Sequence, residues 1–204
     1  EIRPYKILRI APTIGVINGL YANALGKGGV LPIEAAYVPS SNMFDLHLTG
    51  MQGDVMKERM QVAKTLALKL AGQYLNELGP SSKDALFKKG IHIHVPEGAT
   101  KKDGPSAGTA ITIALYSLLS NKPIREDIAI TGEICLSGLV TAIGGLEQKI
   151  IGGIKAGAKH FLFPEENQKD FGRIEETYGP KHILDGIKFD AIKTIDEAIA
   201  LAVV

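Results

Sequence analysis

The chain has 204 residues, which is long enough to bury one large core or two small ones. Hydrophobic residues make up 45% and charged residues 22%, as in ordinary soluble globular proteins. The formal net charge of +1 gives no support for nucleic acid or an anionic membrane surface as the main partner.

A single cysteine, Cys135, excludes an internal disulfide and favours a reducing, intracellular compartment. Cytoplasm and mitochondrial matrix fit equally well. The longest apolar stretch, around Ile111–Leu119, is too short to span a bilayer, and no signal peptide is visible. Because the sequence begins at Glu1 rather than at a methionine, we expect it to be a segment of a longer protein.

Six segments have the short apolar or alternating pattern of strands, bounded by Gly, Pro or Asn. They are Lys6–Ile10, Val30–Val38, Ile91–Val95, Asp127–Thr131, Lys159–Phe163 and Ile187–Ala191. The stretch Asn23–Gly29 has the weakest pattern and reads as a glycine-rich loop.

Four segments are expected to be helical. The first is Val55–Leu78, capped by Asp54 and ended by Gly79-Pro80. The others are Pro105–Leu119, Leu146–Ala158 and a segment after Thr194, where Thr194 and Glu197 have the spacing of a capping box. Helices and strands alternate through the second half, which predicts a mixed α/β domain.

Ser106 lies where a loop, Lys102–Pro105, gives way to the second expected helix. At a helix start the backbone N–H groups lack internal acceptors and the helix dipole is positive, so a developing oxyanion is stabilised there. This position indicates a nucleophile. The alternative is a helix cap, since serine is among the favoured capping residues.

Lys149 shares one face of the third expected helix with small residues: Gly145, Gly152, Gly153 and Ala156. Small residues let another backbone approach closely, so the lysine can lie under a neighbouring segment and away from water. A desolvated amine loses its proton more readily and can act as a general base. The alternative is a solvated lysine, as we expect for Lys155 and Lys159.

Thr131 ends the strand Asp127–Thr131 and opens the run Thr131-Gly132-Glu133. A hydroxyl at a strand end can hydrogen-bond a lysine amine and aim it at the serine. The alternative is a threonine that forms a turn and bonds its own backbone.

His92 and His94 are two residues apart on one strand, so both face the same side. A metal site is one interpretation, but no third ligand has a persuasive spacing. Histidines that form hydrogen bonds beside an active site are the preferred interpretation.

The run Gly104-Pro105-Ser106-Ala107-Gly108 also matches Gly-x-Ser-x-Gly, the nucleophile elbow of α/β-hydrolases. An elbow needs a strand directly before the serine, whereas a loop intervenes here. Asp127 or Asp170 with His182 would complete that alternative triad. The sequence contains neither a P-loop nor a His-Glu-x-x-His motif.

Several of these segments resemble, in order, the proteolytic domain of the Lon protease family over roughly residues 14–204. The Ser106 and Lys149 blocks are the most specific. The matching blocks are Pro32-Ile33-Glu34-Ala35, Leu48-Thr49-Gly50 with 53–58, Ile91–Thr100, Lys102–Gly108, Thr131-Gly132-Glu133, Ile143–Lys149 and Pro164-Glu165-Glu166-Asn167.

The resemblance implies that Ser106 is the nucleophile, Lys149 the general base, and Thr131 the residue that positions the amine. Four further residues match family positions near the active site: Asp103, Glu34, His92 and His94. The stretch around Asp103 is also associated in the family with switching between active and inactive geometries.

The resemblance also implies one compact domain over residues 1–204, with mixed sheets and helices packed on them, and a homohexameric ring. Its expected substrates are unfolded or damaged polypeptides. No metal or organic cofactor is expected in this domain; ATP and magnesium are expected only for an ATPase module outside these residues. The chain departs from the family at Lys101, where a proline is usual, and at 21–24, which replaces a tryptophan-containing segment.

Overall fold

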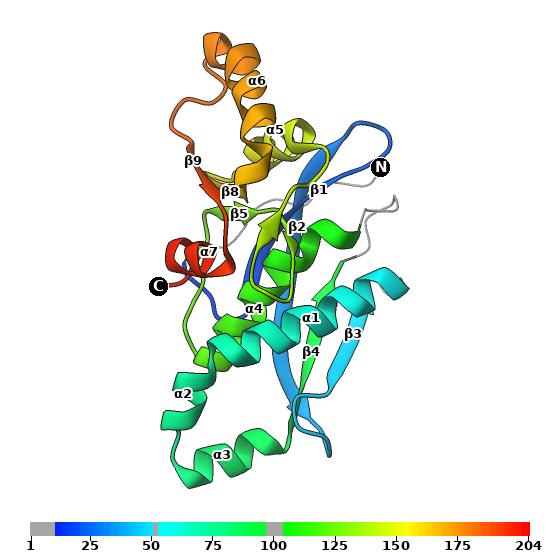
Figure 1. Ribbon diagram of the computed structural model, residues 1–204, viewed down its shortest axis with the longest axis vertical. Coiled ribbons are helices and arrows are strands. Elements are labelled where there is room, and N and C mark those ends of the chain that lie inside the picture. Colours follow the sequence, from blue (N-terminus) through cyan, green and yellow to red (C-terminus); the bar gives the residue numbers. More distant parts are fainter. Residues whose placement is uncertain (1–10, 51–52, 97–103) are drawn as a thin grey trace.

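The computed structural model describes residues 11–50, 53–96 and 104–204, which form one large sheet, a small two-stranded sheet and helices packed around them (Figure 1). The strands are β1 (Val16–Ala22), β2 (Gly28–Pro39), β3 (Leu46–Gly50), β4 (Lys89–Val95), β5 (Ile128–Ile130), β6 (Glu133–Ile134), β7 (Val140–Thr141), β8 (His160–Pro164) and β9 (Lys188–Ile192). The helices are α1 (Asp54–Leu70), α2 (Gly72–Glu77), α3 (Pro80–Phe87), α4 (Gly108–Ser120), α5 (Leu146–Ala156), α6 (Gln168–Tyr178) and α7 (Ile195–Ala202), with 3₁₀ turns at Gly104–Ala107, Glu165–Asn167 and Gly179–Lys181.

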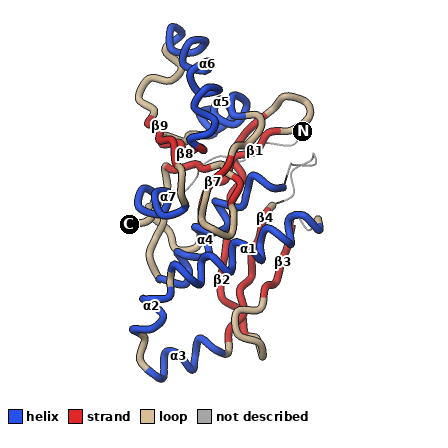
Figure 2. The backbone as a smooth tube through the Cα atoms, in the orientation of Figure 1, coloured by secondary structure: helices blue, strands red, loops and turns tan. Residues whose placement is uncertain are grey.

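The large sheet is mixed and has the strand order β3-β4-β2-β1-β5-β8-β9 (Figure 2). β2 pairs antiparallel with β1 and β4, and the other pairs are parallel. β1 and β2 form a hairpin that ends with the pair Ala22 and Gly28. Between them, the side-chain oxygen of Asn23 accepts hydrogen bonds from the N–H groups of Leu25 and Lys27, so the turn is ordered up to its tip.

Helices α4 and α5 lie on opposite faces of this hairpin. Side chains alternate between the two faces along a strand, so Gly19 and Leu20 on β1 face opposite ways. A Cβ on Gly19 would lie 3.8 Å from Ala110 of α4, whereas the Leu20 side chain would lie 3.0 Å from a Cβ on Gly153 of α5. Helix α1 packs on α4, and α6 packs on α5.

Each face of the sheet has its own core. The larger core lies between the sheet and α4 with α1, and it includes Ile17, Ile33, Ile91, Ile111 and Leu115. The smaller core lies toward α5 and α6, and it includes Leu20, Ile150, Phe161, Phe163 and Phe171. Burial of these apolar side chains is the main stabilising term for both layers.

The predicted mixed α/β domain is confirmed. Five of the six expected strands appear within two residues of their predicted bounds, as β2, β4, β5, β8 and β9. The sixth, Lys6–Ile10, lies outside the described residues. None of the described helices has the length and apolar character needed to cross a membrane.

The single long helix expected over Val55–Leu78 is wrong in detail. Gly53, not Asp54, is the N-cap, and a break at Ala71 separates α1 from α2. Gly72 follows the break, and glycine is a poor residue for a helix interior. The N–H of Ala71 still bonds Ala67, and its carbonyl still accepts from Leu75, so the break is a kink rather than a loop.

Other helix ends also differ from the predicted ones. The expected helix from Pro105 begins as a 3₁₀ turn, and α5 ends at Ala156 because Gly157 has a φ of +102°. Thr194 caps α7 by accepting the Glu197 N–H, but the Glu197 carboxylate bonds the N–H of Lys193, so the capping box is only half formed. Pattern reasoning missed α6, whose buried side chains are Phe171 and Ile174.

Candidate active site

Ser106 lies in the 3₁₀ turn that leads into α4. The N-cap of α4 is Ala107, so the capping position does not fall on Ser106. The serine therefore stands just ahead of the first turn of a 13-residue helix, where backbone N–H groups lack acceptors within the helix. This environment favours stabilisation of an oxyanion over a helix-capping role for Ser106.

The backbone of Gly132 joins the Ser106 turn to the end of β5. Its N–H donates to the Ser106 carbonyl at 3.2 Å, and its carbonyl accepts from the Thr109 N–H and hydroxyl at 3.3 and 2.9 Å. A Cβ at Gly132 would stand 2.8 Å from the Thr109 hydroxyl and 2.6 Å from Val140. The lack of a Cβ at Gly132 allows this close approach, and the bond to the Ser106 carbonyl ties the segment after β5 to the serine turn.

Lys149 is buried, with 3% of its surface exposed. The small face of α5 lies against β2: a Cβ on Gly152 would stand 2.1 Å from the Gly28 carbonyl, and a Cβ on Gly28 would stand 2.0 Å from the Gln148 carbonyl. The predicted close approach of a second backbone is thus confirmed. Lys155, on the other side of α5, is exposed as expected.

Ser106 and Lys149 line the same pocket, which has a volume of about 570 Å³ and is here called the Ser106–Lys149 pocket. This volume is within the range typical of ligand sites. The other described lining residues come from the end of β1 and the turn after it, β6, the segment before α5, and α5 itself: Ala22, Asn23, Ala24, Glu133, Ala142, Ile143, Gly144, Gly145 and Gln148.

The wall between β7 and α5 is held from outside by Glu166 and Asn167. The Glu166 carboxylate accepts the Ala142 N–H at 2.9 Å. The Asn167 amide accepts the N–H of Ile143 at 3.0 Å and donates to its carbonyl at 2.9 Å. Asn167 is 3% exposed, so these bonds replace water at a buried backbone. Sequence analysis included Glu166 and Asn167 among the matching blocks but did not predict that they hold this wall.

Glu133 connects the pocket to α1. Its carboxylate accepts a hydrogen bond from the Arg59 guanidinium at 3.2 Å, and both side chains are about one-third exposed. The ion pair therefore fixes one polar wall of the Ser106–Lys149 pocket and contributes little net stability.

Thr131 directly follows β5 and is fully buried. Its N–H donates to the Leu162 carbonyl, while its hydroxyl has no hydrogen-bond partner among the described residues. The turn interpretation, in which the hydroxyl bonds its own backbone, is therefore wrong. A buried hydroxyl without a partner is unfavourable for folding and calls for another explanation.

His92 and His94 lie on β4 outside the Ser106–Lys149 pocket. Both imidazoles lie within hydrogen-bond distance of the Thr49 hydroxyl, at 2.8 and 2.7 Å. They therefore share one side of the sheet, and the predicted hydrogen bonding is confirmed, whereas their predicted place beside the active site stays a prediction. Within the described ranges, no three His, Cys, Asp or Glu side chains form a cluster able to hold a metal ion.

Glu34 is exposed on β2 and pairs with His94 across the antiparallel ladder. It lies about 20 Å along the strand from Gly28, where α5 crosses β2. The structure thus groups Glu34 with the two histidines. Asp103 lies outside the described residues.

The hydrolase-elbow alternative is not supported. His182 is exposed, and its imidazole bonds Asp185 at 3.0 Å rather than Asp127 or Asp170. Asp170 instead accepts from Asn167 at 2.9 Å. The serine lies within a 3₁₀ turn.

The chain is similar to known proteins over nearly its whole length. The family model for the Lon protease (S16) C-terminal proteolytic domain matches residues 3–204. A Lon protease of Fusobacterium nucleatum is 41% identical over 204 residues, all of this chain and 25% of its own length. Lon protease 1 of Sorangium cellulosum is 41% identical over 186 residues, which are 91% of this chain and 21% of the relative.

A Lon protease of Fervidobacterium nodosum is 40% identical over 191 residues, 94% of this chain and 22% of its own length. The chain thus spans about a quarter or less of the relatives that it matches. Because the family model covers nearly every residue, the chain belongs to the family of Lon protease (S16) C-terminal proteolytic domains, and it is a peptidase domain.

Proposed function

We propose that the chain hydrolyses peptide bonds with Ser106 as nucleophile and Lys149 as general base. The observation that carries this proposal is the burial of a lysine in the wall of the same pocket as a serine at a helix start. Desolvation disfavours the charged form of an amine, and a neutral amine can accept a proton.

In the first step, the Lys149 amine takes the proton of the Ser106 hydroxyl while Oγ attacks the scissile carbonyl carbon. Backbone N–H groups at and beside Ser106 stabilise the oxyanion; one such donor contributes on the order of 3 kcal/mol to transition-state binding. The intermediate collapses, the C–N bond breaks, and Lys149 returns the proton to the leaving amine.

In the second step, water attacks the acyl-enzyme and Lys149 accepts its proton. The ester bond to Oγ then breaks, the serine regains a proton, and the acid product leaves. Every proton in this cycle moves through side chains of this chain, so the proposed chemistry requires no metal or organic cofactor. We assign to Thr131 the positioning of the amine: its buried hydroxyl forms no hydrogen bond among the described residues, so its contact with Lys149 would form during the catalytic cycle.

We further propose that the substrates are unfolded or damaged polypeptides delivered by an ATPase module of the parent protein, and that the domain works in a homohexameric ring. The names of the relatives, of which this chain matches about a quarter or less, support the link to proteolysis. The pocket of about 570 Å³ suits an extended chain better than a folded protein.

The test is hydrolysis of a fluorogenic peptide by the full 204-residue chain and by three variants. Ser106→Ala and Lys149→Met should each reduce kcat by on the order of 10³-fold or more, because each removes one partner of the proton transfer. Methionine keeps the volume of the lysine stem in its buried position. The matched control is Lys155→Met, on the exposed side of α5, which should retain activity.

Labelling by a fluorophosphonate separates the remaining alternatives. A serine-reactive probe should modify Ser106 in the unaltered chain and leave the Lys149→Met variant unmodified. An active Lys149→Met variant would refute the dyad, and a His182→Ala variant without activity would favour the hydrolase triad. A chain that folds but reacts with neither probe nor peptide would be an assembly module without catalysis.

A further inference from the structure

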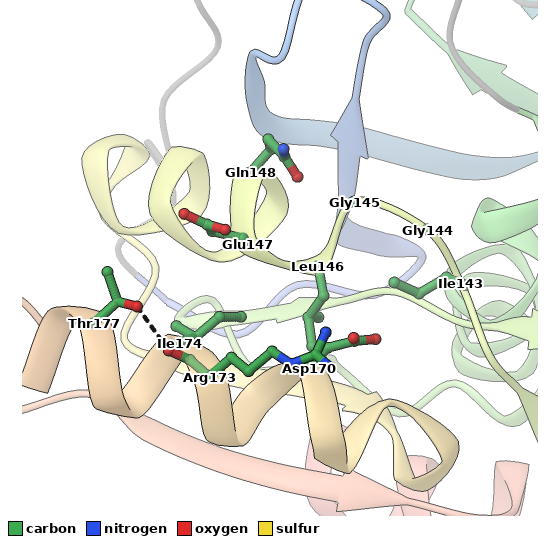
Figure 3. A pocket seen from close by; sticks show the side chains of 10 residues that line it. All are labelled: Ile143, Gly144, Gly145, Leu146, Glu147, Gln148, Asp170, Arg173, Ile174 and Thr177. Carbon is green, nitrogen blue, oxygen red and sulfur yellow. Dashed lines mark hydrogen bonds between the residues drawn. The ribbon is translucent and has the colours of Figure 1, made fainter.

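A second pocket lies between α5 and α6, on the other side of the segment that walls the Ser106–Lys149 pocket (Figure 3). Its volume is about 380 Å³, and we call it the α5–α6 pocket. Its lining residues are Ile143, Gly144, Gly145, Leu146, Glu147, Gln148, Asp170, Arg173, Ile174 and Thr177.

The two pockets are continuous in their lining. Both include Ile143, Gly144, Gly145 and Gln148. Gly144 leaves an opening at this shared wall: apart from its chain neighbours, no described atom lies within 4 Å of the position that a Cβ would occupy. At this point of the shared wall, the described residues leave room over Gly144 for an extended chain bound beside Ser106.

The wall that the chain would cross is rigid. Asn167 holds the backbone of Ile143 by two hydrogen bonds, and Glu166 holds the N–H of Ala142. A surface held in place in this way binds a ligand at a lower entropic cost, because little of it must be ordered on binding.

The charged groups of the α5–α6 pocket have an excess of negative charge. Glu147 accepts a hydrogen bond from the Tyr178 hydroxyl at 2.6 Å, and Asp170 accepts one from the Asn167 amide at 2.9 Å. Both donors are neutral, so neither carboxylate charge is cancelled. Arg173 is the pocket's cation, and its side chain extends along α6 toward Asp170 (Figure 3).

We propose that the α5–α6 pocket is a second substrate subsite, which takes residues of the polypeptide beyond those held at the scissile bond and prefers basic over acidic side chains there. This inference rests on the proposed peptidase function. The half-buried side chain of Ile143 supplies apolar contact for any residue, and the two carboxylates against one guanidinium supply the preference.

Substrate length provides the first test. A nested set of peptides shares one cleavage site and grows by one residue at a time on either side. For the full chain, kcat/KM should rise on one side by roughly fivefold once the peptide reaches the subsite, as expected for burial of one small apolar group. Thr177→Trp fills the pocket from α6 and should reduce the ratio of kcat/KM between long and short peptides to about one.

The matched control is Gln168→Trp, an exposed position of α6 outside the pocket lining, which should keep the ratio. A ratio of one for the unaltered chain, or an equal ratio for both tryptophan variants, would overturn the subsite. Absence of cleavage for every peptide, short ones included, would instead overturn the proposed function.

Charge provides the second test. A lysine at the subsite position should be preferred over a glutamate by about two- to fivefold at low ionic strength, as for a partly exposed charge contact. Arg173→Glu should increase this preference, whereas Lys169→Glu makes the same charge change on α6 outside the pocket and should leave it unchanged. A preference for glutamate, or equal shifts in both variants, would refute the assignment.

Discussion

Gly152 is a position where the backbone of α5 lies close against β2, and substitution by alanine tests whether this contact sets the geometry of the site. The added Cβ would stand 2.1 Å from the carbonyl carbon and oxygen of Gly28 and 2.5 Å from the nitrogen of Gly29. Ordinary carbon contacts are about 3.5–4.0 Å long, so α5 must move from β2 by roughly 1.5 Å. Backbone atoms on both sides leave no flexible side chain to yield.

This displacement has two consequences of different size. Overpacking costs about 1–3 kcal/mol of unfolding free energy, partly offset by the roughly 1 kcal/mol that alanine gains over glycine in a helix. Lys149 lies one turn earlier on the same face of α5 and moves with the helix. A misplacement of about 1 Å in a reacting group reduces the rate by about 10²-fold. Activity should therefore fall far more than stability.

The assay compares kcat with the urea-unfolding free energy for Gly152→Ala and for a control, Gly172→Ala. Gly172 lies on α6 with no described atom, chain neighbours aside, within 4 Å of its Cβ position, so alanine fits there and should keep full activity. A folded Gly152→Ala variant with kcat within twofold of the unaltered chain would refute the link between helix seating and catalysis.

Four further predictions concern the site and its surroundings. Thr131→Val should leave the unfolding free energy unchanged or raise it by about 1 kcal/mol, because it removes a buried hydroxyl without a described partner. The same variant should reduce kcat about tenfold, and an unchanged kcat would exclude a role of Thr131 in positioning the amine. Asn167→Ala should cost about 1–3 kcal/mol in urea unfolding, since two part-buried backbone groups of Ile143 lose their hydrogen-bond partner, and a cost below about 0.5 kcal/mol would contradict the clamp. The rate constant kcat/KM should rise with pH as the Lys149 amine loses its proton, whereas a flat profile from about pH 6 to 9 would argue against a lysine base. Burial, and then the neighbouring Tyr74, raise the pKa of Tyr37 from 10.0 to about 12. The contribution of Tyr37 to stability is therefore complete below pH 10 and is lost as pH rises toward 12. In urea unfolding at increasing pH, Tyr37→Phe should reduce this alkaline loss of stability, and an equal loss in both proteins would contradict the shift.

Much of the candidate site could be predicted from local sequence patterns. The serine at a helix start and the lysine among small residues could be selected because both depend on neighbours within one or two helical turns. Five strand positions followed from apolar alternation and turn residues, which report burial directly. Helix α6 escaped because its two buried side chains, Phe171 and Ile174, are too few to form a clear period in a polar segment.

The sequence by itself determined which chemical groups are available and their order along the chain: a serine, a threonine at a strand end and a lysine on a small-residue face. Only the tertiary structure decided where these groups lie in space. It brought Gly28 under α5, placed Asn167 behind the pocket wall, and joined His92 and His94 through Thr49. The physical reason is that burial and hydrogen bonding at the site come from strand order and helix seating, which join residues far apart in the chain and leave no local period in the sequence.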